Sequence, residues 1–286
     1  MTQRLGIIGY PIGHSISPIF QQAGLDHLGI DATYEKWEVT PDKVGEFVAS
    51  LRSPGTLGIN ITVPHKRAVI PFLDEVDEWA TTAGAVNTIV NRDGRLTGHN
   101  TDGPGFLRAL LVETGYSPEG TRALILGAGG AARGILLALV RGGVESLVIA
   151  NRTLERAQTL AQLAQDNGVA AEAISLSQDD ALTQAAANAD LIVNCTTMGM
   201  SHGPDEHGSP LSAAQIPATA IVNDVVYNPM QTPLLREAAT AGATGLGGLH
   251  MLVYQGVLSF QMWTGQDAPV AVMLEAATKE MASRGT

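Results

Sequence analysis

Apolar residues near the start of the chain fall into short runs separated by stretches with helical spacing. The runs at 5–9, 33–39 and 57–63 have the length and composition of strands. Between them, the stretches at 19–28 and 42–51 have the apolar spacing of helices. This β-α-β-α-β order predicts a parallel sheet in an α/β fold.

The next part of the chain predicts a hairpin and a long helix. Apolar and polar residues alternate across 86–98, where Asp93-Gly94 has the composition of a two-residue hairpin turn. A helix is then expected from Gly103 to about Gly115.

A second series of strands follows that helix. After an apolar run that begins at Arg122, further runs predict parallel strands at 146–150, 190–196, 220–226 and 243–246. Beyond Gly247 the pattern becomes helical, and the last helix is expected at 270–281. The helices beyond Gly247 lie outside the second strand series, so we expect them to pack on the first part of the chain.

The run that begins at Arg122 leads into a glycine-rich turn. Gly127, Ala128, Gly129, Gly130 and Ala131 are followed by Ala132, in the G-x-G-x-x-A form of the dinucleotide-binding fingerprint. Glycines there let a pyrophosphate approach the backbone at a helix N-terminus, where free N–H groups favour an anion.

The end of the next strand indicates which dinucleotide is bound. NAD-binding proteins carry a carboxylate at this place, whereas this chain has Asn151, Arg152 and Thr153, with Arg156 one turn later. Two guanidinium groups and a hydroxyl suit a 2′-phosphate, so we expect NADP. A helix start with surface arginines is the alternative, and it accounts for Arg156 alone.

These patterns predict an α/β protein of two domains. Residues 1–102 plus 247–286 are expected to form a substrate-binding catalytic domain. Residues 103–246 are expected to form a Rossmann-type, doubly wound NADP-binding domain.

Two polar residues of the first domain are candidates for catalysis. Lys66 closes a strand whose Asn60 and Thr62 share one face with Pro64, and Asp102 ends the hairpin. The chain has only four lysines, so one at the end of a strand is a candidate functional residue. A lysine and an aspartate in one cleft form a proton-transfer pair, because each shifts the pKa of the other.

Other polar residues gather in loops at the carboxyl ends of the first-domain strands. Ser15 and Ser17 precede a helix, so they are either N-caps or ligands of a carboxylate at the helix N-terminus. Asn87 opens the hairpin and Gln255 lies on the penultimate helix, and turn geometry or exposure explains either one alone. With the polar residues named above they supply many donors and acceptors but no metal cluster, which suits a small polyhydroxylated acid.

Composition narrows the class of protein. The formal net charge is −11 and the basic residues form no run, which argues against nucleic acid as a partner. No stretch of about 18 apolar residues is present for a membrane span, and the start of the chain lacks the apolar region of a signal peptide. Cys195 is the only cysteine and ends a buried strand, so we expect an inert thiol in a cytoplasmic protein.

Seven segments, in the same order from end to end, resemble those of the shikimate dehydrogenase family. They are Gly9-Tyr-Pro-Ile-Gly-His-Ser-Ile-Ser-Pro18, Asn60-Ile-Thr-Val-Pro-His-Lys66, Gly84-Ala-Val-Asn-Thr88, Asn100-Thr-Asp102, Gly127-Ala-Gly-Gly-Ala-Ala132, Asn151-Arg-Thr153 and Gly248-Leu-His-Met-Leu-Val-Tyr-Gln255. The chain departs from the family at Gln21-Gln22, where His-Asn or His-Gln is usual. That position lies on a helix, so the departure concerns packing more than chemistry.

The resemblance implies an NADP-dependent interconversion of 3-dehydroshikimate and shikimate in aromatic amino-acid biosynthesis. It implies Lys66 as the proton-transferring residue, with Asp102 as its partner on the reacting hydroxyl. It also implies substrate contacts from Ser15, Ser17, Thr62, Asn87, Tyr227 and Gln255. On the cofactor side it implies the 127–131 loop, the 151–156 segment, Val225, Gly248 and Glu78.

Two other functions compete with this one. A quinate or aminoshikimate dehydrogenase would share the scaffold, but members that use NAD should carry an acidic segment in place of 151–156. A catalytically silent paralogue would bind the ligand and regulate a partner, yet it need not keep both Lys66 and Asp102. The sequence leaves the oligomeric state open, a homodimer included.

Overall fold

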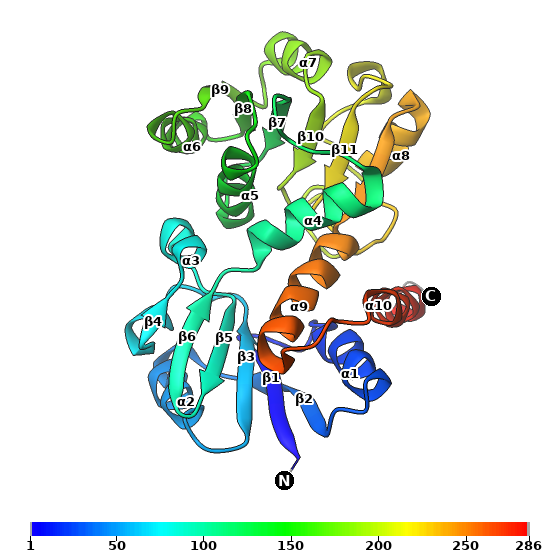
Figure 1. Cartoon of the computed structure of the whole chain (residues 1–286). Helices are drawn as coiled ribbons and strands as arrows, with labels where there is room; N and C mark the ends of the chain where they lie inside the picture. Colours follow the sequence, from blue (N-terminus) through cyan, green and yellow to red (C-terminus); the bar gives the residue numbers. More distant parts are fainter. Residues whose placement is uncertain (1, 285–286) are drawn as a thin grey trace. The chain divides into compact units, whose positions relative to one another are not determined.

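The computed structural model describes residues 2–284, which form two compact units, each built around its own sheet (Figure 1). The first unit comprises the described residues of Met1–Gly105 and Leu252–Thr286, and the second comprises Phe106–Met251. These divisions fall inside two helices, α4 (Asp102–Thr114) and α9 (Gly248–Thr264), so no loop signal in the sequence marks them. The assignment of one role to each domain stays a prediction.

The first unit contains a mixed six-stranded sheet in the order β2-β1-β3-β5-β6-β4. Its strands are β1 (Gln3–Gly9), β2 (Ala32–Glu38), β3 (Thr56–Ile61), β4 (Glu75–Val76), β5 (Thr88–Arg92) and β6 (Arg95–His99). β1 pairs in parallel with β2 and β3, as the β-α-β-α-β pattern predicts. β5 and β6 form the predicted hairpin, in which Asp93 and Gly94 both have positive φ.

Helices complete the first unit. They are α1 (Ser17–His27), α2 (Val44–Ser50), α3 (Glu78–Ala83) and α10 (Val270–Arg284), with short 3-10 turns at Pro41–Lys43 and Ile70–Phe72. α10 packs against α1, which brings the last described residues onto the first helix. Apolar side chains from both sheet and helices are fully buried, among them Phe20, Ile59 and Phe260. Their burial removes apolar surface from water and holds the sheet under the loops described below.

The second unit contains a six-stranded, fully parallel sheet in the order β12-β11-β10-β7-β8-β9. Its strands are β7 (Arg122–Leu126), β8 (Ser146–Asn151), β9 (Ala170–Ser175), β10 (Leu191–Asn194), β11 (Ile221–Asp224) and β12 (Thr244–Gly247). Its helices are α5 (Gly130–Arg141), α6 (Leu154–Asp166), α7 (Asp179–Ala187) and α8 (Pro233–Ala241), with a 3-10 turn at Ala213–Gln215. This is the predicted Rossmann-type, doubly wound arrangement, which confirms the α/β fold.

Two strands have no counterpart among the predicted elements. Three of the six residues of β9 are alanine and only Ile174 is β-branched, so this edge strand has little of the composition that marks a strand. β4 is only two residues long. The predicted strands at 190–196 and 220–226 are also longer than β10 and β11, because their last residues belong to loops at the carboxyl end of the sheet.

Candidate active site

The structure brings Lys66 and Asp102 together. Lys66 Nζ lies 2.6 Å from Asp102 Oδ2, and the two side chains keep 30% and 25% of their surface exposed. Asp102 is the first residue of α4, where a negative charge is favourable at the helix N-terminus. Partial burial strengthens the ion pair, and partial exposure leaves room for a small ligand.

Asn87 fixes the other oxygen of the same carboxylate. The backbone N–H of Thr101 donates to Asn87 Oδ1 at 2.8 Å, so the amide nitrogen of Asn87 faces Asp102 Oδ1, also at 2.8 Å. Both oxygens of Asp102 therefore accept hydrogen bonds, as an ionised carboxylate does. Lys66 and Asn87 donate these two hydrogen bonds, and of the two only the ammonium of Lys66 can also transfer its proton to a substrate.

Gln255 reaches this cluster from α9. Its Oε1 lies 3.2 Å from Asn87 Nδ2, and its own amide nitrogen donates to the carbonyl of Leu252 at 2.7 Å. Gly105 makes this approach possible, because a Cβ there would lie 2.6 Å from the backbone nitrogen of Gln255. A residue that sequence alone leaves as exposed is thus held against Asn87.

A buried polar network lies behind Asn87. Asn60 Nδ2 donates to Thr88 Oγ1 at 3.2 Å and to Ser259 Oγ at 3.0 Å. Its Oδ1 accepts from the hydroxyl of Tyr34 at 2.7 Å. Protein groups bond to both ends of this amide and only 3% of the residue is exposed, so Asn60 helps to hold Asn87 in place.

A contact of Asn60 with the substrate stays a prediction, and the network adds residues that the sequence did not reveal. Tyr34, Thr88 and Ser259 are hydroxyl residues inside regular elements, and nothing in their local pattern marks them. Thr101 has a weak signal in the sequence, because it lies directly before Asp102. In the structure its hydroxyl accepts from Asn87 Nδ2 at 2.9 Å.

The two serines differ in their roles at the start of α1. Ile16 is the N-cap residue and Ser17 is the first helical residue, so N-capping, one of the two alternatives for the serines, does not apply to Ser17. Ser15 Oγ accepts instead from the backbone N–H of Ser17 at 3.2 Å. Ser15 and Thr62 are both half-buried, each in the loop after a strand of the parallel part of the sheet.

The glycine-rich loop lies between β7 and α5 in the second unit. Gly127 has φ +103°, and a Cβ there would lie 3.1 Å from the backbone of Cys195, so this turn needs glycine. At Gly129 and Gly130 a Cβ would meet no protein atom within 4 Å. Protein packing does not explain those two glycines, whereas a phosphate group close to the backbone at the start of α5 does. Ala128 and Ala131 beside them are also small residues.

Polar and basic residues lie at the end of β8, where the adenosine ribose of a dinucleotide binds in this fold. Asn151 Nδ2 donates to the carbonyl of Thr153 at 2.8 Å, which holds the turn into α6. Arg152 and Arg156 are exposed, and neither guanidinium has a hydrogen bond or ion pair within residues 2–284. These unengaged cations fit a phosphate dianion.

Other predicted residues lie outside these clusters. Val225 and Tyr227 follow β11, and Gly248 begins α9. Tyr227 belongs to the second unit, whereas the other residues expected to contact the substrate belong to the first. Glu78, expected to contact the cofactor, is the first residue of α3 in the first unit.

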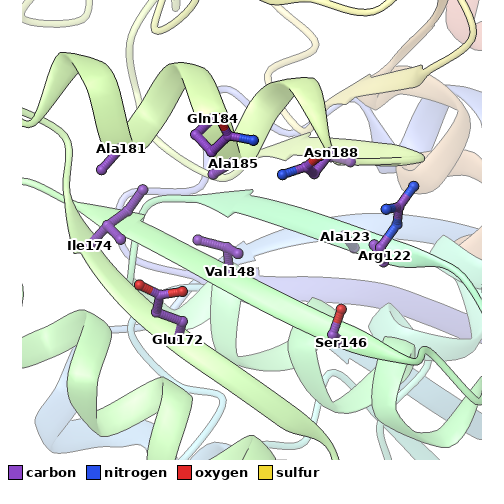
Figure 2. Close-up of a pocket in the computed structure, with 11 residues that line it drawn as sticks. Arg122, Ala123, Ser146, Val148, Glu172, Ile174, Ala181, Gln184, Ala185 and Asn188 are labelled. Carbon is purple, nitrogen blue, oxygen red and sulfur yellow. The ribbon is translucent and has the colours of Figure 1, made fainter.

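A hollow of about 510 Å³ in the second unit is separate from the glycine-rich loop (Figure 2). Side chains of β8, β9 and α7 line it, together with Arg122 and Ala123 at the start of β7. The glycine-rich loop follows the opposite end of β7. Within the described residues, no group of three metal-binding side chains occurs and no helix is long and apolar enough to cross a membrane.

Comparison with known proteins gives the same family over the whole chain. Sequence models match at 7–89 (shikimate dehydrogenase substrate binding domain), 112–202 (shikimate/quinate 5-dehydrogenase) and 248–278 (shikimate 5′-dehydrogenase C-terminal domain). The NADP(+) shikimate dehydrogenase of Methanopyrus kandleri is 46% identical over 282 residues, covering 98% of this chain and 96% of that protein.

Solved structures agree with the sequence relatives. Shikimate 5-dehydrogenase from Thermus thermophilus, in complex with NADP(H) and shikimate, is 38% identical with a TM-score of 0.84, covering 97% of this chain and 99% of the other. Quinate dehydrogenase from Corynebacterium glutamicum in complex with NAD is 33% identical with a TM-score of 0.87, covering 97% and 99%. The resemblance seen in the seven sequence segments is therefore confirmed: this chain belongs to the shikimate dehydrogenase family.

Proposed function

We propose that this protein is an NADP-dependent shikimate dehydrogenase, which reversibly reduces 3-dehydroshikimate to shikimate for aromatic amino-acid biosynthesis. The observation that carries the proposal is the ion pair of Lys66 and Asp102, oriented by Asn87, in one unit of a chain whose other unit has a dinucleotide-binding loop.

Lys66 acts as the proton donor in the direction of reduction. Bound NADPH supplies the hydride to the carbonyl carbon of the substrate. Negative charge then develops on the carbonyl oxygen, and the ammonium of Lys66 stabilises that charge and transfers a proton to it. Asp102 orients Lys66 and accepts a hydrogen bond from the hydroxyl of the product.

The substrate is a hydroxylated ring with one carboxylate, and the proposed contacts divide between these groups. Asn87, Gln255 and Thr62 supply donors and acceptors for hydroxyls. Ser15 and Ser17 lie at the start of α1, where hydroxyls and helix N–H groups favour a carboxylate. Tyr227 and Asn60 are further proposed contacts. The side-chain amide of Asn60 also donates to the backbone carbonyl of Asn87 at 3.1 Å, which orients Asn87.

The cofactor is proposed to bind along the carboxyl end of the second sheet. The 127–131 loop would hold the pyrophosphate, and Arg152 and Arg156, with Asn151 and Thr153, would hold the 2′-phosphate. Val225, Gly248 and Glu78 are further proposed contacts. The protein is proposed to act in the cytoplasm, without nucleic acid as a partner and with a homodimer as its proposed assembly.

A quinate dehydrogenase that uses NAD is the nearest rival, because a protein of that name has the same fold. The segment after β8 favours NADP, since it carries two arginines and no carboxylate before Glu155. A silent binding protein is disfavoured by the intact Lys66–Asp102 pair.

One spectrophotometric experiment separates these functions. The purified chain is assayed with shikimate and with quinate, each against NADP and NAD. Turnover of shikimate with NADP well above the other three combinations supports the proposal. Preference for quinate with NAD would replace it with the rival, and no turnover in any combination would favour the silent binding protein.

A further inference from the structure

A buried carboxylate lies in the second unit, outside the groups used above. Asp224 is the last residue of β11 and is 0% exposed. Among the described residues, no lysine, arginine or histidine forms an ion pair with it. Removing a carboxylate from water costs free energy unless hydrogen bonds replace the water. The groups that bond to Asp224 therefore show what it holds in place.

Three donors converge on this carboxylate. Asn194 Nδ2 and the backbone N–H of Val226 donate to Asp224 Oδ1 at 2.9 and 3.1 Å. The hydroxyl of Thr232 donates to Oδ2 at 2.6 Å. Burial raises the pKa of the Asp224 carboxyl, and these same hydrogen bonds oppose that rise.

The donors come from separate segments that Asp224 joins. Asn194 ends β10, and Thr232 is the N-cap residue of α8, where its Oγ1 also accepts from the N–H of Leu235 at 3.3 Å. Asp224 thus ties the ends of two strands to the start of α8 and closes the 225–232 loop at both ends.

One side of this arrangement supports the glycine-rich turn. Asn194 Oδ1 accepts from both the backbone N–H and the hydroxyl of Thr196, at 3.0 and 2.7 Å. A Cβ on Gly127 would lie 3.1 Å from Thr196 Cγ2, so Thr196 packs directly under that turn.

The other side supports the start of α9. A Cβ on Gly248 would overlap the backbone carbonyl of Val225 and would lie 3.0 Å from the carbonyl oxygen of Asp224. The backbone N–H of Gly248 donates to the carbonyl of Val226 at 3.3 Å. The hydrogen-bonded group around Asp224 therefore lies against three residues that are proposed to contact the cofactor, namely Gly127, Val225 and Gly248.

We propose that Asp224 is a positioning residue for the nucleotide site, which sets the 195–198 and 225–232 segments against the turn at Gly127 and the start of α9. This inference rests on the proposed function for the identity of the ligand. Asp224 touches neither substrate nor cofactor in this role and acts through Asn194, Val226 and Thr232.

Three variants of the full chain test the inference. Asp224→Ala removes the acceptor of all three donors. Asp224→Asn keeps an oxygen for Asn194 and Val226, and the Thr232 hydroxyl can turn to accept from the new amide. Asn223→Ala is the matched control, because Asn223 is equally buried on the same strand but donates to Leu246 of β12 instead.

NADPH affinity is measured directly by fluorescence titration, alongside the KM for shikimate. Asp224→Ala should weaken NADPH binding at least about tenfold, or 1.4 kcal/mol. Asp224→Asn should recover most of that affinity, and Asn223→Ala should bind NADPH within about twofold of the wild type even if it melts earlier. Equal NADPH affinity in the wild type and a folded Asp224→Ala would overturn the inference.

Hydrogen exchange separates this test from the proposed function. In Asp224→Ala the amides of 195–198 and 225–232 should exchange faster, while those of β8 keep their protection. A wild type that fails to bind NADPH would end the proposed function, but the exchange pattern would still decide whether Asp224 positions these segments. Unchanged exchange in both segments would refute it.

Discussion

The ammonium of Lys66 lies 2.6 Å from the carboxylate of Asp102, although 36 positions separate the two residues in the chain. The turn after β3 places Lys66, and the N-terminus of α4 places Asp102. Asn87 donates to the other carboxylate oxygen, so both oxygens of Asp102 act as hydrogen-bond acceptors and Lys66 is the acid of the pair. This division of roles makes the first prediction specific to Lys66.

Replacing Lys66 should slow the chemical step. Lys66→Ala should lower kcat by about 10²–10⁴ and leave the affinity for shikimate within a few-fold, because proton transfer acts in the transition state. Rates are followed by NADPH absorbance, and shikimate binding by calorimetry. Lys43→Ala is the control, since Lys43 forms only an exposed pair with Glu46. Full kcat in Lys66→Ala would remove Lys66 from the mechanism.

Local sequence revealed the residues that stand at the ends of strands. Lys66 and the 127–131 loop each follow an apolar run, so their polarity or glycine content contrasts with the neighbouring strand, and Asp102 stands at the end of the predicted hairpin. That contrast is a local signal, and the fold needed only to bring the carboxyl ends of the strands together.

The supporting residues have no such signal. Thr88 and Ser259 are 2.7 Å apart but 171 positions apart in the chain, and a hydroxyl inside a strand or helix is common. Asp224 lies within a predicted strand, so only the arrangement of Asn194 and Thr232 around it reveals its role. Long-range hydrogen bonds of this kind depend on tertiary packing, which periodicity does not encode.

Cofactor choice should depend on Arg152. Loss of one charge-assisted contact to a 2′-phosphate costs about 1.5–3 kcal/mol, which is roughly 10- to 150-fold in NADP affinity, with little effect on NAD. Arg152→Ala is compared with Arg141→Ala, at the opposite end of α5 from the glycine-rich loop. Equal weakening of NADP and NAD by Arg152→Ala would show that this arginine does not contact the phosphate.

The serines at α1 can be told apart by their different bonds. Ser17 does not cap the helix, so Ser17→Ala should raise the KM for shikimate with little loss of thermal stability. Ser15→Ala should raise the KM for shikimate and also lower thermal stability, because Ser15 Oγ accepts the N–H of Ser17. The loss in the free energy of unfolding should be about 0.5–2 kcal/mol. A normal KM in the double variant would place the substrate carboxylate elsewhere, with Tyr227 the first residue to test.

Acid stability should depend on the pair of Arg122 and Asp190. The Arg122 guanidinium holds the pKa of the Asp190 carboxyl below its usual value of 3.8. The pair therefore stabilises the folded chain above that value, and the contribution is lost as pH falls through the lower pKa of the folded state.

Asp190→Asn should accordingly lower Tm near neutral pH, and the difference from the wild type should shrink at the acid end. The effect should stay at or below about 1 kcal/mol, because solvent screens both side chains. Combining Asp190→Asn with Arg122→Ala should add little to either change alone. A Tm difference that stays constant across the acid range would contradict the assigned pair.

The approach of α9 to α4 should tolerate no side chain at Gly105. A Cβ there would lie 2.6 Å from the nitrogen and 2.7 Å from the Cα of Gln255, so Gly105→Ala must push α9 away and move Gln255 from Asn87. Overpacking of this kind costs about 1–3 kcal/mol in the free energy of unfolding. The KM for shikimate should rise, while the affinity for NADPH stays close to that of the wild type.

Gly134→Ala in α5 is the matched control, because its Cβ would meet nothing within 4 Å and helix propensity favours alanine by up to about 1 kcal/mol. If Gly105→Ala keeps both the Tm and the shikimate KM of the wild type, Gln255 is not held by this contact and its place among the substrate ligands loses its structural basis.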